Sequence, residues 1–126
     1  MANVAREETE SRNALFPRLL SGEEALKLVG VGAFELVQGR IIKMDYTGDE
    51  HGLMESDISW HLINFNKKHK LGWVLTGEVG VYTQHNPDTV RAADIVFVSY
   101  KRLPAPTGKA LAVAPELIVE ITSPGD

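Results

Sequence analysis

The sequence predicts an α/β domain in which helices pack against a mixed β-sheet. Two stretches have the periodicity of helices, and the other apolar segments are short and strand-like. They follow the order helix, hairpin, long helix and strands, with no internal repeat. The chain has 126 residues, of which 44% are apolar, and this suits one domain. We expect that domain to cover residues 15–126, after a flexible, mixed-charge arm over residues 1–14.

The first half of the chain begins with a short helix and a hairpin. Residues 21–30, SGEEALKLVG, place Ser21 and Glu24 at capping-box spacing, and Gly30 offers a stop. Residues 33–46, AFELVQGRIIKMDY, alternate as two strands around the tight turn Gln38-Gly39.

The long helix is expected over residues 47–72. Thr47 and Glu50 again have capping-box spacing, and Gly72 is its expected end. Four apolar residues follow the helical period and predict its packed face: Met54, Ile58, Leu62 and Phe65.

The second half of the chain predicts three strands. Residues 73–83 are strand-like with an interruption at Gly77, and the turn QHNPDT follows. Residues 94–99 form an apolar strand. A loop rich in Pro and Gly then leads to the last strand, residues 116–122.

Composition excludes several classes of site. The absence of cysteine removes disulfides, thiolate zinc sites and cysteine nucleophiles, and it suits a reducing compartment, so we expect a cytoplasmic protein. The sequence has no Gly-x-Ser-x-Gly elbow and no Gly-rich phosphate loop, which argues against a serine hydrolase and a nucleotide-binding protein. The net charge of −4 argues against a sequence-blind nucleic-acid binder, but it leaves room for an enzyme that contacts DNA locally.

Two acids stand in apolar strands. Asp94 heads the segment DIVFVS, and Glu120 lies within ELIVEIT. A buried carboxylate costs several kcal/mol unless it is paired, hydrogen-bonded or bound to a metal. A divalent cation between the two acids would also offset their mutual repulsion, and oxygen ligands suit Mg²⁺ or Mn²⁺. The alternative is that each acid is solvated at the end of its strand.

Five segments carry a family resemblance: FELVQGRI, GDEHG, GEVGVYT, VRAADIVFVS and APELIVEITSPGD. In this order and spacing, the chain resembles the Uma-two restriction endonuclease family of the PD-(D/E)xK nuclease superfamily. The resemblance implies a restriction-endonuclease-like fold, hydrolysis of DNA phosphodiester bonds with Mg²⁺ or Mn²⁺, and a homodimer.

The resemblance also assigns residues. It places the metal-binding acids at Asp94 and Glu120, both counted as catalytic together with His51 at the start of the long helix. Supporting acids of the family correspond to Glu35 and Glu78. The literal Pro87-Asp88 pair falls in a turn and is not the family position, which has Ala93 before its Asp. His51 and Glu55 share one helical stripe with Ile58 and Leu62, although we interpret Glu55 as a surface acid.

The chain departs from the superfamily at Thr122, where a lysine is usual. The resemblance implies that the lysine comes instead from a helix beyond Asp126, so we expect this chain to be incomplete at its C-terminus. Two alternatives stay open: a catalytically inactive nuclease fold serving as a DNA-binding or assembly module, and a structural domain whose acids are only solvated.

Cations for DNA contact are sparse. The densest basic stretch is NKKHK, residues 66–70, and the helix dipole alone accounts for cations at a helix C-terminus. Three further cations flank the strand of Asp94 and are within reach of a phosphate: Arg91, Lys101 and Arg102.

Overall fold

The computed structural model describes residues 18–28 and 32–123. These residues form two compact units, one drawn from 1–45 and 82–91, the other from 46–81 and 92–126. The expected arm over residues 1–14, the stop at Gly30 and the chain end at Asp126 lie outside the described residues. The single domain over 15–126 stays a prediction. No helix of the described part is long and apolar enough to span a bilayer.

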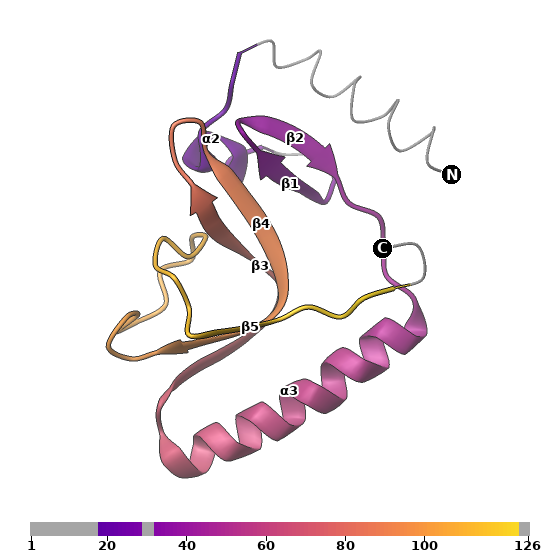
Figure 1. Cartoon of the computed structure of the whole chain (residues 1–126), viewed down its shortest axis with the longest axis vertical. Helices are drawn as coiled ribbons and strands as arrows, with labels where there is room; N and C mark the ends of the chain where they lie inside the picture. Colours follow the sequence, from indigo (N-terminus) through magenta and orange to yellow (C-terminus); the bar gives the residue numbers. More distant parts are fainter. Residues whose placement is uncertain (1–17, 29–31, 124–126) are drawn as a thin grey trace. The chain divides into compact units, whose positions relative to one another are not determined.

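The α/β prediction is confirmed (Figure 1). Hydrogen bonds join the strands in the order β2-β1-β4-β3, and β5 pairs with β4. β1 pairs antiparallel with β2 and β4, and β4 pairs antiparallel with β5. These pairings are antiparallel rather than mixed as predicted, and a parallel bridge between Val81 and Leu111 is isolated. The two long strands, β3 (Gly72–Gln84) and β4 (Thr89–Ser99), run through both units.

In the described part of the first unit, the helix is α2 (Gly22–Leu26). Its predicted capping box is confirmed, because Ser21 Oγ accepts the Glu24 N–H and Glu24 Oε1 accepts the Ser21 N–H. This satisfies two backbone donors that the first helical turn leaves without partners. A helix of five residues is too short to be stable alone, so its packing must hold it.

The predicted hairpin is also confirmed. β1 (Phe34–Val37) pairs with β2 (Arg40–Lys43), and Val37 lies opposite Arg40. Gln38 and Gly39 both have positive φ, 48° and 78°, as a two-residue turn of this handedness requires. A side chain at Gly39 would also come within 2.8 Å of Leu19 Cβ. The core of this unit is formed by Leu20, Ala25, Leu36 and Ile41.

The second unit contains the long helix, α3 (Asp49–His69). The predicted capping box at Thr47 is wrong, because the N-cap is Gly48, which has no side chain to accept a helix N–H. The predicted stop at Gly72 is also wrong. The helix ends at Lys70, whose φ of 50° is left-handed, and Asn66 Oδ1 accepts the N–H groups of Leu71 and Gly72. Lys70 therefore takes the left-handed position that glycine often occupies at a helix end, and Asn66 fixes the two residues that follow.

Gly72 instead begins β3 and permits close packing. A Cβ on it would collide with the Val98 carbonyl oxygen and lie 2.7 Å from Ser99 Cα. The start of β3 is thus fitted against the end of β4.

The apolar face predicted for α3 is wrong in part. Met54 and Phe65 are exposed, and Ile58 and Leu62 are half-buried. The two buried residues of α3 are polar, His51 and Ser59. The core of this unit is formed instead by Val81, Ala93, Val96 and Leu111.

Candidate functional site

Asp94 lies inside β4, not at the head of a strand. The strand begins five residues earlier, at Thr89, because the mixed run TVRAA is also extended. Ile95, Val96 and Val98 have no solvent exposure, and Asp94 itself is buried. The alternative that Asp94 is a solvated strand end is therefore wrong. Its carboxylate needs partners inside the fold.

Glu120 comes directly after β5 (Leu117–Val119). Ile95 pairs with Val119, so the same register continued by one residue sets Asp94 opposite Glu120. Two hydrogen bonds join these positions. The Asp94 N–H donates to Glu120 Oε1 at 3.3 Å, and the Ile121 N–H donates to Asp94 Oδ2 at 2.8 Å. The structure thus brings together the two acids of the predicted metal site, with Glu120 on the exposed side.

His51 is the third predicted residue, in the first turn of α3. It is buried, and its Nε2 lies 3.3 Å from Asp94 Oδ2. A protonated imidazole at this distance forms an ion pair with the carboxylate, and Nε2 lies against Oδ2. The imidazole therefore holds one oxygen of Asp94. Among the described residues, the other oxygen, Oδ1, accepts no hydrogen bond.

A polar stripe continues from His51 along α3. His51, Glu55 and Ser59 follow one another at four-residue spacing, so they lie on one face of the helix. Each has a fully buried polar atom without a hydrogen-bond partner in the described part of the chain: His51 Nδ1, Glu55 Oε1 and Ser59 Oγ.

The interpretation of Glu55 as a surface acid is wrong, because it is half-buried on this stripe. Ser59 was missed altogether. The signal in the sequence was the same four-residue spacing, hidden because apolar residues occur all around the helix. Such groups in native proteins usually bind ordered water or an ion, and His51 connects the stripe to Asp94.

The geometry agrees with the sequence comparison. The Uma2 family model, described as "Putative restriction endonuclease", matches residues 23–126. The chain belongs to the Uma2 family. No curated protein matches it in sequence. Membership confirms the resemblance and the restriction-endonuclease-like fold, and it points to a nuclease.

The donor set of this Uma2 chain fits a hard divalent cation. Asp94 and Glu120 offer carboxylate oxygens, the ligands that Mg²⁺ and Mn²⁺ prefer. Over residues 18–28 and 32–123, no three His, Asp or Glu side chains are close enough to enclose an ion by themselves. Mg²⁺ does not need such a cage, because it keeps several waters and is commonly held by one or two carboxylates.

The two supporting acids are placed differently. Glu35 lies on β1, and its Oε2 is 3.0 Å from Arg91 Nε, so its charge is balanced within the first unit. Arg91 is therefore engaged rather than free for a phosphate. Glu78 is exposed on β3 with a φ of 61°, and in the described part of the chain no contact joins it to Asp94, Glu120 or His51.

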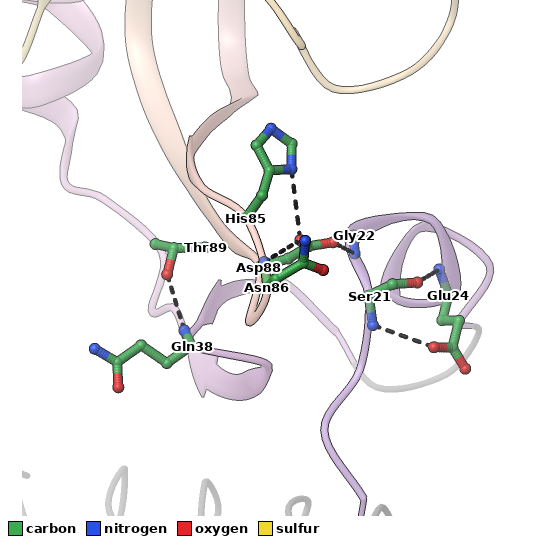
Figure 2. Close-up of polar contacts among 8 residues, drawn as sticks. All are labelled: Ser21, Gly22, Glu24, Gln38, His85, Asn86, Asp88 and Thr89. Carbon is green, nitrogen blue, oxygen red and sulfur yellow. Dashed lines mark hydrogen bonds and ion pairs between the residues drawn. The ribbon is translucent and has the colours of Figure 1, made fainter.

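Asp88, of the literal Pro-Asp pair, has a structural role (Figure 2). Its Oδ2 accepts the Gly22 N–H at 2.8 Å and its Oδ1 accepts the Asn86 N–H at 3.3 Å. Next to it, Thr89 Oγ1 accepts the Gln38 N–H. Asp88 thus ties α2 to the β3–β4 turn. The Gly22 N–H, as the main cause, and the Asn86 N–H lower the pKa of Asp88 below its usual value.

Thr122 marks the departure from the superfamily pattern. It is exposed and brings no positive charge to the site. The charge balance at Asp94 and Glu120 therefore depends on groups other than residue 122.

Proposed function

We propose that this chain is a divalent-metal-dependent endonuclease that hydrolyses phosphodiester bonds of DNA. The observation that supports it most is the convergence of Asp94, Glu120 and His51 from β4, the end of β5 and α3. Family membership supports a nuclease, and the two carboxylates supply the chemistry of a cation site.

Each residue has a distinct role in this proposal. Asp94, through the open Oδ1, and Glu120 would hold Mg²⁺ or Mn²⁺. His51 Nε2–H and the Ile121 N–H fix Asp94 Oδ2, so that Oδ1 keeps its direction. A cation bound there supplies a water of lowered pKa and neutralises charge that develops on the phosphate.

In this proposal, the polar stripe of α3 holds water on one side of the metal site. In the neutral imidazole with its proton on Nε2, Nδ1 is an acceptor, as is Glu55 Oε1. Water bound at the His51 end of the stripe would lie close to Asp94, where an attacking water must be oriented. Glu55 and Ser59 act as positioning residues in this scheme.

The first experiment is calorimetric titration with Mn²⁺ of the wild type, Asp94→Asn and Asp88→Asn. The two variants remove the same charge from side chains of similar exposure, so Asp88→Asn is a matched control. We expect saturable binding in the wild type and the control, and none in Asp94→Asn. Equal binding by all three proteins would contradict the site.

A second candidate function is an inactive nuclease fold that binds DNA. Thr122 favours it, because the superfamily's positive charge is missing at that position. Incubation of supercoiled plasmid with Mg²⁺, Mn²⁺ or EDTA separates the two. Metal-dependent nicking that Asp94→Asn loses supports the nuclease, whereas metal binding with intact plasmid supports the inactive module.

A further inference from the structure

Cations are concentrated on one part of the second unit. Residues 58–77 and 95–115 contain no acid, although the chain carries 17 Asp and Glu and a net charge of −4. Six of the thirteen Lys and Arg residues lie in these two segments: Lys67, Lys68, Lys70, Lys101, Arg102 and Lys109. The protein is acidic as a whole but has a strongly basic region.

Several contacts bring the two segments together. The Tyr100 N–H donates to the Leu71 carbonyl at 3.3 Å, directly after Lys70. Trp73 Nε1–H donates to the Leu103 carbonyl at 2.7 Å, and the Trp73 and Tyr100 rings meet edge to face at 5.1 Å. The end of α3 and the turn after β4 are thus fixed side by side.

The cations there lack counter-charges. Lys67, Lys68, Lys70 and Lys101 are exposed, and none has an ion-pair partner in the described part of the chain. Arg102 is the exception: its Nε lies 3.7 Å from Glu116 Oε1 and its Nη1 donates to the Ala114 carbonyl. The helix dipole accounts for cations in the last turn of α3, but not for Lys101 and Arg102, which are outside the helix. Like charges held close together favour a polyanionic partner.

We propose that this basic surface, formed by Lys67, Lys68, Lys70 and Lys101, binds the phosphate backbone of duplex DNA beside the cleavage site. The inference rests on the proposed function, since it takes the Asp94–Glu120 site as the place of cleavage. It adds where the substrate lies and which residues hold it.

The distance to the site sets the footprint. From His51 to Lys67 the helix rises about 24 Å, at about 1.5 Å per residue. From Asp94 to Ser99 the strand rises about 17 Å, at about 3.3 Å per residue. Duplex DNA advances about 3.4 Å per base pair along each strand, so the basic surface meets the backbone about five to seven base pairs from the scissile phosphate.

The aromatic residues favour a duplex over a single strand. Phe65 is stacked on His69 with centroids 4.1 Å apart, and Tyr100 packs on Trp73. Each of these exposed rings has another ring as its neighbour, as Trp60 has His61 at its edge, whereas single-strand binding uses free rings on which bases stack.

The test is fluorescence anisotropy with a labelled 20-base-pair duplex in EDTA, where no cleavage occurs. The variants are Lys101→Gln and the triple Lys67→Gln, Lys68→Gln, Lys70→Gln. The control is Lys27→Gln, an exposed lysine of the first unit. We expect Kd to rise about 3–10-fold for Lys101→Gln and roughly 30–100-fold for the triple variant, with a salt slope lower by about 2–3, because each phosphate contact contributes about 0.9 to that slope.

Three results would overturn the inference. Lys27→Gln could weaken binding as much as Lys101→Gln, which would mean that only net charge matters. The wild type could prefer single-stranded DNA or RNA to the duplex, or it could bind no duplex at low salt. Because EDTA removes the cation, these outcomes do not depend on the metal site, and failure of the Mn²⁺ titration would leave them unchanged.

A series of duplex lengths sharpens the test. Affinity should increase up to the length that reaches from the cleavage site to the basic surface, and the triple variant should lose this dependence. The same length dependence in the triple variant would contradict the footprint.

Discussion

Asp88 and Asp94 lie six residues apart and have nearly the same side-chain exposure, 15% and 12%. Asp88 is surrounded by donors, since the backbone N–H groups of Gly22 and Asn86 bind its two oxygens and His85 Nδ1 is 3.6 Å away. Asp94 has the Ile121 N–H and His51, but it also has a second acid, Glu120, beside it.

The difference between these regions teaches that burial does not distinguish an acid that stabilises a turn from one proposed to bind a cation. The contacts of Asp88 balance its charge, so the turn is stabilised with the carboxylate ionised. The contacts of Asp94 leave one oxygen open and add negative charge nearby, which favours a cation. The partners of an acid are therefore more informative than its exposure.

The largest expected effect is on catalysis. Glu120→Gln keeps the shape of the side chain but removes its charge, and we expect the rate of metal-dependent cleavage to fall on the order of 10²–10³-fold. Glu116→Gln is a nearby control, because Glu116 contacts Ser99 and Arg102 rather than Asp94. Single-turnover cleavage of a labelled duplex measures both. Equal rates in the two variants would remove Glu120 from the site.

At Asp88 we expect a loss of stability rather than a loss of activity. Asp88→Ala leaves the Gly22 and Asn86 N–H groups without their acceptor, and we expect it to lower the free energy of unfolding by about 2 kcal/mol. Urea denaturation measures this, with Mn²⁺ titration of the folded variant as the second readout. A variant that keeps wild-type stability but loses metal binding would reverse the roles of the two aspartates.

The stability of the turn should depend on pH. The pKa of Asp88 is lowered in the folded protein. Its contribution to the free energy of unfolding is therefore fully present above the unfolded pKa, about 4, and is lost as pH falls through the folded pKa. We expect the wild type to lose more stability between pH 6 and pH 3 than Asp88→Asn does. Urea midpoints at both values test this, and parallel losses would show that other carboxylates dominate.

The smallest expected effects are changes in the free energy of unfolding of two serine variants. Ser21→Ala removes the cap of α2 and should cost about 1 kcal/mol. Ser59→Ala removes a buried hydroxyl that has no hydrogen-bond partner in the described part of the chain and that ordered water satisfies in our proposal, so it should cost less than Ser21→Ala. Thermal denaturation of both variants gives the comparison. A marked stabilisation by Ser59→Ala would mean that the hydroxyl is dry and that the stripe holds no water there.

Local signals in the sequence predicted local structure well. The Ser21–Glu24 box and the Gln38-Gly39 turn involve residues at most three positions apart in the sequence, and both are confirmed. The Thr47–Glu50 box is wrong although its spacing is the same, because the chain enters α3 one residue later, at Gly48. Spacing alone does not determine which residue caps a helix.

The site was predictable only in part. His51, Asp94 and Glu120 were expected and lie together, and the family model supports the motifs that suggested them. Their roles stay predictions. The inner face of α3 was misassigned because Met54, Trp60 and Phe65 are exposed apolar residues, so hydrophobic periodicity gave no clear phase. The position of Asp94 inside β4 depends on strand pairing, which periodicity does not specify.

The two hydrogen bonds between residues 94 and 120–121 have a consequence for folding. Each connects positions more than 25 residues apart, and each uses a backbone N–H on one side and a carboxylate on the other. Each segment therefore donates one of these hydrogen bonds and accepts the other, so neither acid reaches its position until both segments have docked. Partly folded chains would then lack the site, and assembly of the site becomes a late, cooperative event. The amide proton of Ile121 reports on this event, since its exchange with solvent should follow the breaking of these two hydrogen bonds rather than fraying elsewhere.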